Sequence, residues 1–297
     1  MTSNNGDGNA TTTSSSRKHY EAIQWNNIAV NDLEKSQLED ALTNFRRALV
    51  LSKQSLAESR LHYQQAQDDW KKRSGSIDDL VISSVSLPDD GNVTGSTTNA
   101  ASSYIHRQAI SVPMPEENVG PDHHSCLILS TVILFNIALT NHLLAEEEEE
   151  EAAMMTTVRK QQQGAFGSHY HDQHHHLQQL QQIHDERRAC FLSRSIQLYE
   201  MVNRVLSDRK NQLNSPLLML VTINNIGVAC QSLGDKNRAN QAFEYLLSTM
   251  FLLSERCEKS SHSGQQGRSS GIPFNLTERF IRNVSYLMTT TCTAPAA

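Results

Sequence analysis

Histidines gather in one short stretch of the chain and are the first candidates for metal chemistry: His169, His171, His174, His175 and His176. Clustered imidazole nitrogens bind transition metals. The stretch is also rich in Gln, contains no cysteine, and is not accompanied by an HExxH or calcium-loop motif. We interpret it as a solvated, compositionally biased tract whose metal affinity is at most adventitious. We therefore expect neither a metal nor a cofactor to take part in the function.

A run of glutamates, Glu146 to Glu151, is the other concentrated group of ionisable side chains. Such a run is typical of a solvated face, with a docking site for a basic partner as the alternative. The sequence contains no glycine-rich phosphate loop of the GxxxxGK[ST] type and no GxGxxG fingerprint. Generic carboxylates on helices do not by themselves make an acid–base pair. The sequence therefore predicts a protein that is not an enzyme.

Asparagines recur in a fixed local context. Asn26 and Asn27 precede Ile-Ala, Asn224 and Asn225 precede Ile-Gly, and Asn136 precedes Ile-Ala. An asparagine amide offers both a donor and an acceptor, so it can bind a peptide group whatever side chain that residue carries. Two interpretations stay open: these amides contact the backbone of an extended ligand, or they satisfy neighbouring backbone groups between helices.

The segments that carry these residues have the pattern of helices. All seven prolines lie outside the apolar-periodic segments or at their starts, as helices require. No alternating strand pattern recurs with turn signals between copies. The sequence therefore predicts an all-α fold, with Ser215 capping the helix that starts at Pro216. The expected helices cover about 17–34, 37–72, 125–145, 186–209, 216–232, 236–256 and 275–290.

The chain repeats itself. Residues 25–30 (Trp-Asn-Asn-Ile-Ala-Val) recur as residues 223–228 (Ile-Asn-Asn-Ile-Gly-Val), and the same offset relates Ala41 to Ala239 and Phe45 to Phe243. A third copy begins at Leu134, and its second half follows much later as Ser195, Tyr199 and Val202. Repetition of this kind is the signature of stacked structural units.

Each copy pairs small residues with large ones. Ala29, Ala138 and Gly227 would let the first helix of a copy approach the second helix closely. Phe45 and Phe243, on the second helices, would fill the remaining space. The sequence therefore predicts antiparallel helix pairs in which neither helix buries its apolar stripe alone.

This spacing resembles the tetratricopeptide repeat, a helix–turn–helix unit of about 34 residues. The first copy departs from the family's preferences at Asp32 and Lys53. The matching positions are Trp25, Ile28, Ala29, Ala41, Phe45 and Ala48 in the first copy, Leu134, Ile137, Ala138, Ser195 and Tyr199 in the middle copy, and Ile223, Ile226, Gly227, Ala239 and Phe243 in the last.

The resemblance implies a short solenoid of stacked helix pairs whose first helices line a concave groove for peptides. It also implies that the residues facing this groove contact a protein or peptide partner. Those residues are Asn26, Asn27, Val30, Asn136, Asn224, Asn225 and Val228.

Composition narrows the classes of protein that remain possible. With 26 Lys plus Arg and 32 Asp plus Glu, the net charge is −6, and no basic stretch offers a footprint for nucleic acid. Five cysteines without a CxxC pair argue against a disulfide framework or a zinc site, so we expect reduced thiols in an intracellular protein, in the cytoplasm. Residues 126–144 carry no charge, yet their many polar side chains favour a helix buried in a stack over a membrane span.

The hydrophobic fraction, 38%, is below the roughly 45–50% of ordinary globular chains, so we expect disordered parts. The expected organisation is a disordered tail at 1–16, a first helix pair at 17–73, a disordered insertion at 74–125, a second pair at 126–210 interrupted by a low-complexity insertion at 146–185, a third pair at 216–256, a linker at 258–272 and a capping helix at 274–290.

Together these observations predict a non-enzymatic adaptor that binds an extended or helical segment of a partner protein, without nucleic acid or membrane. The alternative is a structural or self-assembling helical protein, in which the long helix over 37–72 would mediate homo-oligomerisation. An enzyme whose catalytic residues leave no local motif is the third class.

Overall fold

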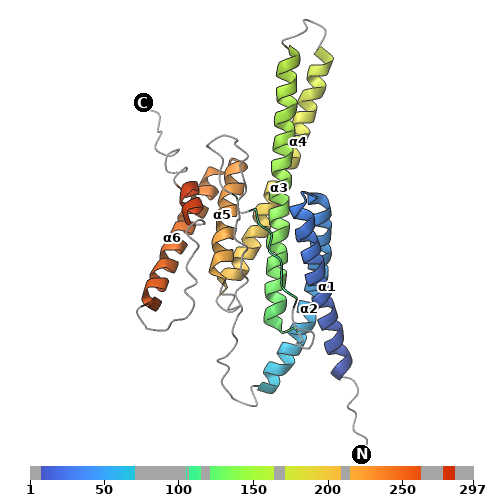
Figure 1. Cartoon of the computed structure of the whole chain (residues 1–297), viewed down its shortest axis with the longest axis vertical. Coiled ribbons are helices and arrows are strands. Elements are labelled where there is room, and N and C mark those ends of the chain that lie inside the picture. The colour runs from blue at the N-terminus through green and yellow to red at the C-terminus, as the bar shows by residue number, and fades with distance from the viewer. Residues whose placement is uncertain are drawn as a thin grey trace, which may run out of the picture. The chain divides into compact units, whose positions relative to one another are not determined.

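The computed structural model describes residues 8–70, 105, 107–114, 121–163, 171–208, 215–261 and 277–284. Within these ranges every regular element is a helix, which confirms the predicted all-α class. The helices, shown in Figure 1, are α1 (Gly8–Glu34), α2 (Leu38–Trp70), α3 (His123–Gln163), α4 (His171–Ser207), α5 (Pro216–Ser232) and α6 (Lys236–Ser261), followed by a short helix over 277–284.

The chain forms two compact units. The first contains Met1–Gly91, Gln108–Thr140 and Arg204–Ser215, and the second contains Asn92–Arg107, Asn141–Asn203 and Pro216–Ala297. The long helix α3 begins in the first unit and continues into the second.

In the first unit, α1 and α2 form an antiparallel hairpin (Figure 1). Its core contains Ala29, Ala41 and Phe45, all fully buried, which are the small and large residues predicted to meet there. The structure differs from the sequence prediction at the amino-terminal end, because the expected disordered tail over 1–16 is helical from Gly8. Ser15 is buried there, and its hydroxyl lies 3.4 Å from that of Ser55 on α2.

In the second unit, α5 and α6 form a second hairpin. The Ser215-Pro216 signal marks the observed start of α5. A Cβ atom added at Gly227 would lie 2.6 Å from Cζ of Phe243, so only glycine permits this approach of the two helices. The predicted small-to-large contact is therefore confirmed here. The helix over 277–284 adds the buried Phe280 and Val284 to the same unit.

The two hairpins turn in the same way. Ser36 and Gly234, which occupy equivalent positions in the repeat, both have left-handed backbone, with φ of 59° and 84°. After Ser36, the Gln37 N–H donates to the Asp32 carbonyl at 2.9 Å. After Gly234, the Asp235 N–H donates to the Cys230 carbonyl at 2.9 Å. The first and last copies of the internal repeat thus share the conformation of their turn. The stacking of the pairs into a tetratricopeptide-like solenoid stays a prediction.

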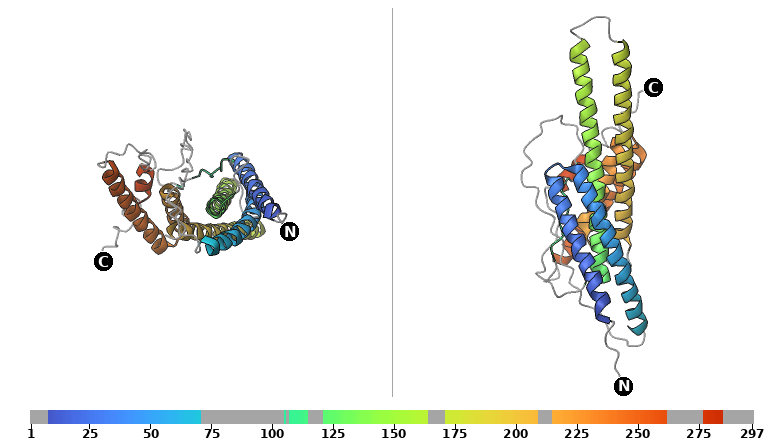
Figure 2. Two further views of the ribbon diagram at one scale, coloured as in Figure 1. Left: turned by 90° about the horizontal axis from the view of Figure 1, so that it is seen from below. Right: turned by 90° about the vertical axis from the view of Figure 1, so that its right-hand side faces the viewer.

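Residues 146–163 and 171–185, expected to belong to a disordered insertion, are helical and extend α3 and α4 (Figures 1 and 2). Two causes are visible. Glu and Gln, which are frequent here, are good helix formers. The glutamates also find basic partners: Glu146 contacts Arg107 at 3.0 Å, and Glu149 contacts Arg188 on α4 at 2.8 Å.

Helix α3 includes a stretch, His123–Thr157, that is long and apolar enough to cross a membrane. Within its most apolar window, 78% of the residues are buried inside the protein. Core helices of soluble proteins meet the same criteria of length and composition, so this helix alone does not indicate a membrane protein.

A third difference concerns the expected insertion over 74–125. Most of it lies outside the described residues, as do 1–7 and 262–276. Residues 108–114 are described, form no helix, and are here called the extended segment. Its Ala109 and Ile110 side chains are buried. Pro113 restricts the residue before it to extended backbone, which favours this conformation.

Candidate functional site

The extended segment is held by asparagine side chains of the first unit. Asn136, on α3, binds both backbone polar groups of Ile110. The Ile110 N–H donates to Asn136 Oδ1 at 2.8 Å, and Asn136 Nδ2 donates to the Ile110 carbonyl at 2.9 Å. Asn136 therefore binds Ile110 through its backbone and makes no demand on its side chain.

Asn27, on α1, repeats this arrangement two residues further along. The Val112 N–H donates to Asn27 Oδ1 at 3.0 Å, and Asn27 Nδ2 donates to the Val112 carbonyl at 2.8 Å. Successive peptide groups of an extended chain alternate in direction, so residues 110 and 112 present their polar groups to the same side. Asn27 and Asn136 occupy equivalent positions in the repeat, and each binds one of them.

Asn26 connects these two amides. Its Nδ2 donates to the Ile110 carbonyl at 3.1 Å and to Asn27 Oδ1 at 3.2 Å, and its Oδ1 accepts from Asn136 Nδ2 at 3.0 Å. We call Asn26, Asn27 and Asn136 the asparagine cluster. Asn26 and Asn136 are fully buried, and their hydrogen bonds offset the cost of removing two amides from water.

The other predicted partner-binding residues do not join this cluster. Asn224 Oδ1 accepts from Asn283 Nδ2 at 2.7 Å, and Asn225 Nδ2 donates to the Tyr199 hydroxyl at 3.1 Å. Both amides are buried within the second unit. In the last copy, these amides therefore bind side chains of other helices, whereas the structural interpretation expected backbone groups.

Val30 and Val228 were also predicted to face a partner. Both are buried, so neither presents its side chain to solvent. Contact of any of the predicted residues with a second molecule stays a prediction.

The extended segment itself was not predicted from the sequence. The available signal was a short apolar run, Ala109-Ile110 and Val112, directly before Pro113 in an otherwise polar stretch.

A cysteine–histidine pair, also missed, lies in the first unit. Cys126 Sγ lies 3.6 Å from His19 Nδ1 and 3.3 Å from Ser55 Oγ. A thiol beside an imidazole can act as a nucleophile when it is deprotonated and accessible. Here the thiol is fully buried, and burial raises the pKa of Cys126 and lowers the pKa of His19. Both shifts favour the neutral forms, which are those of an inert core pair.

His142 is a buried histidine of the second unit whose pKa is strongly shifted. It is almost fully enclosed, and burial lowers its pKa to about 3, helped by the positive charges of Arg107 and Arg188. Its ring meets that of Tyr199 edge-on, with centroids 6.3 Å apart. Burial also raises the pKa of Tyr199. Among the residues that the structure describes, neither ring nitrogen of His142 has a hydrogen-bond partner. The ring therefore stays neutral and serves as an apolar filler.

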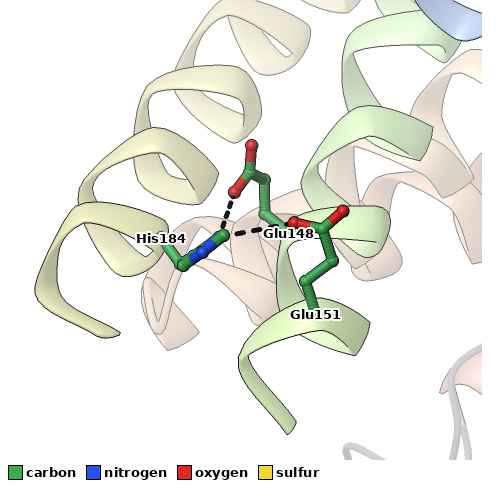
Figure 3. A group of neighbouring side chains, drawn as sticks. All are labelled: Glu148, Glu151 and His184. Carbon is green, nitrogen blue, oxygen red and sulfur yellow. Dashed lines mark hydrogen bonds and ion pairs between the residues drawn. The ribbon is translucent and has the colours of Figure 1, made fainter. Parts of the chain in front are cut away.

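One group of side chains in the second unit has the composition of a metal site. Glu148 and Glu151 come from successive turns of α3 and point toward His184 on α4 (Figure 3). His184 Nδ1 lies 2.5 Å from Glu148 Oε2 and 3.7 Å from Glu151 Oε2, and one ligand atom of each residue lies within 4.8 Å of the others. These three residues could hold a divalent transition metal.

A cation would have to compete for Glu148. Arg187 already contacts Glu148 Oε1 at 3.0 Å, and the side chain of Glu148 is buried between its partners. Without a metal, the contacts of Glu148 with His184 and Arg187 form a polar network that joins α3 to α4. The histidines predicted to form a solvated tract include His169, outside the described residues, and His176, whose side chain is exposed on α4.

No family model, no curated protein and no solved structure matches this chain. The tetratricopeptide resemblance therefore stays a prediction; what the structure shows is that the two hairpins share a turn.

Proposed function

We propose that the protein is a non-enzymatic adaptor that binds an extended segment of a partner protein through the asparagine cluster. The observation that carries the proposal is the pairwise binding of Ile110 and Val112 by Asn136 and Asn27. Each amide binds the N–H and the carbonyl of one residue, which is the arrangement needed to hold any extended peptide by its backbone.

The position of the cluster supports the same function. Asn27 and Asn136 stand on the first helices of two repeat copies, which in the tetratricopeptide resemblance line a concave groove for peptides. The affinity for a partner would come from apolar burial beside the cluster and from hydrogen bonds to the backbone. Because the partner has to become ordered, the net affinity would be modest and exchange would be fast. No cofactor, nucleic acid or membrane belongs to the proposal, and we expect a cytoplasmic location.

A peptide selection tests the proposal. A random-peptide library is selected on the full chain, and the recovered peptides are titrated against wild type, an Asn27→Ala/Asn136→Ala variant and an Asn44→Ala control. Asn44 also binds through its amide, to Asp32 at 2.8 Å, but lies outside the cluster. We expect the peptides to lose binding at least tenfold to the double variant and to bind the control normally. Peptides that bind the double variant as well as wild type would contradict the proposal, provided that circular dichroism shows native helix content.

Self-assembly is the second candidate. Tyr245, Phe251 and Leu252 are exposed on α6, with Phe251 69% accessible, and large apolar groups on one helix often mark an interface. In this case a second copy would cover α6, rather than the long helix α2 that the sequence suggested. Light scattering after size-exclusion chromatography decides: a dimer that Phe251→Glu dissociates supports self-assembly, and a monomer at all concentrations contradicts it.

A further inference from the structure

The asparagine cluster is already occupied by the chain's own extended segment, and this has a consequence for the proposed adaptor function. We infer that residues 108–114 are a tethered ligand, which the partner has to displace with an extended segment of the same chemistry. The inference rests on the proposed function and adds to it the partner's sequence requirements and a form of autoinhibition.

Removal of the extended segment from the asparagine cluster would cost free energy. Five hydrogen bonds join it to the extended segment: two from Asn136, two from Asn27 and one from Asn26. Departure of the segment would leave amide groups of Asn26 and Asn136 without these partners at a site that is fully buried in the occupied state. Because a buried amide without a hydrogen bond costs free energy, a competing peptide must supply the same backbone groups.

Side-chain burial defines what the competing peptide must look like. Ala109 is 8% exposed and Ile110 is 2% exposed, so the peptide needs a small residue followed by a large aliphatic one. Ser111 and Pro113 are exposed, and these two places are free to vary. Val112 is half-buried, which favours a β-branched residue that prefers extended backbone.

The hydrogen bonds add one strict exclusion. The N–H groups of Ile110 and Val112 both donate to the cluster, at 2.8 and 3.0 Å. Proline has no N–H, so it is excluded at these two places. Proline is tolerated at the place of Pro113, one residue after the last bond, where it favours extended backbone in the residue before it. The partner motif is therefore small–aliphatic–any–β-branched, with proline allowed only outside the two bonded places.

The covalent link between the extended segment and the cluster determines how strongly the segment competes with a partner peptide. A ligand that is covalently linked to its own site competes at an effective concentration that can reach the order of 1 mM. If the free peptide binds an open cluster with a dissociation constant of about 10–100 µM, the tethered copy weakens the apparent affinity of any competitor by roughly 10- to 100-fold. Binding of a partner would then depend on its concentration, or on a second contact that raises its affinity.

The test uses a fluorescent peptide with the sequence of residues 108–114, titrated against the full chain by anisotropy. In the opened variant, Ile110→Pro with Val112→Pro, the tethered segment loses both donors while every cluster residue is kept. The matched control is Ser111→Pro, which adds a proline to the same segment at an exposed place between the two bonded residues. A second peptide, with proline at its third and fifth positions, controls for the backbone bonds.

We expect the opened variant to bind the peptide 10- to 100-fold more tightly than wild type and the Ser111→Pro control, and no binding of the proline peptide. Equal affinity of wild type and the opened variant would overturn the inference of a tethered competitor and leave the adaptor function intact. If the opened variant keeps its helix content and binds no peptide, the proposed function fails as well. A wild-type dimer that the opened variant cannot form would identify a second copy as the occupant and overturn the inference of a foreign partner.

Discussion

A methyl group added at Gly227 would lie 2.6 Å from Cζ and 2.7 Å from Cε1 of Phe243, well inside van der Waals contact. The ring is almost fully buried, so it is enclosed by other parts of the protein. The approach of α5 to α6 therefore depends on the absence of a side chain at residue 227.

We predict that Gly227→Ala destabilises the protein by about 1–3 kcal/mol, because forced overpacking outweighs the better helix propensity of alanine. Denaturant unfolding measures the change. Phe243→Leu removes the clashing ring atoms, so the double variant should be less destabilised than the sum of the two single variants. Simple additivity would show that the two residues do not clash.

The shared turn of the two hairpins predicts a reciprocal pair of variants. Ser36 has a φ of 59°, a conformation that costs a non-glycine residue free energy, whereas the equivalent residue of the other hairpin is Gly234. Ser36→Gly should therefore raise the free energy of unfolding by about 1 kcal/mol, and Gly234→Ser should lower it by a similar amount. Thermal melts would show shifts of a few degrees in opposite directions. Destabilisation by Ser36→Gly would contradict the left-handed turn.

Loss of one cluster amide should expose one particular backbone group. In Asn136→Ala the Ile110 N–H loses its acceptor, so its hydrogen exchange should accelerate at least tenfold, and in Asn27→Ala the Val112 N–H should respond first. Removing a buried partner should also cost Asn136→Ala about 1–3 kcal/mol of stability. Residue-resolved exchange by NMR measures both amides, with Asn44→Ala as the control. Unchanged exchange at Ile110 would show that Asn136 does not hold the segment.

The lowered pKa of His142 predicts that the protein loses stability in acid. The unfolded chain takes up a proton on this histidine as the pH falls below about 6.5, whereas the folded protein takes it up only near pH 3. The free energy of unfolding should therefore fall between these two pH values, by up to about 4 kcal/mol from this group. Denaturant melts from pH 7 to pH 4 should show a shallower decline in His142→Phe than in wild type. The exposed His176 is the control, and His176→Ala should follow wild type.

Two neighbouring glutamates of α3 pair with arginines of α4, and they differ in burial: Glu148 is buried and Glu149 is exposed. Glu148→Ala would leave Arg187 and His184 beside an enclosed position and should cost about 2–4 kcal/mol. Glu149→Ala removes the partner of Arg188 at a position 62% exposed and should cost less than about 1 kcal/mol. Denaturation of the two variants side by side measures the difference. Equal losses would mean that burial of Glu148 does not contribute.

Sequence patterns identified the helices more reliably than their ends. Small residues opposite Phe45 and Phe243, with prolines outside the apolar stripes, were enough to locate the hairpins. The extension of α3 and α4 through the glutamate run was not predicted, because composition alone indicates a solvated segment. Those helices also pair through Arg187 and Arg188, and Arg188 lies 39 residues after its partner Glu149.

For the asparagines, too, the sequence predicted one part of the structure and not another. Their repetition indicated that an amide at this position binds a backbone group, and Asn27 and Asn136 do so. The sequence left open whether the bound backbone belongs to a ligand or to the same chain, and it did not reveal that residues 108–114 would supply it. That depends on the return of residues 108–114 to the first unit, for which one short apolar run was the only local signal. Asn225 could not be distinguished from Asn27 by pattern, since its partner, Tyr199, comes from the displaced half of another copy.

The separation in sequence between Asn27 and Val112 has a consequence for the order of folding. The α1–α2 and α5–α6 hairpins close over turns of a few residues, so they can form on local contacts. The bonds from Asn27 to Val112 join residues 85 apart, and closing so long a loop costs entropy before any bond is gained. We expect the hairpins to form early and the asparagine cluster to be completed late. A chain emerging from the ribosome would then expose α1, with Asn26 and Asn27 unoccupied, until residues 108–114 had been synthesised.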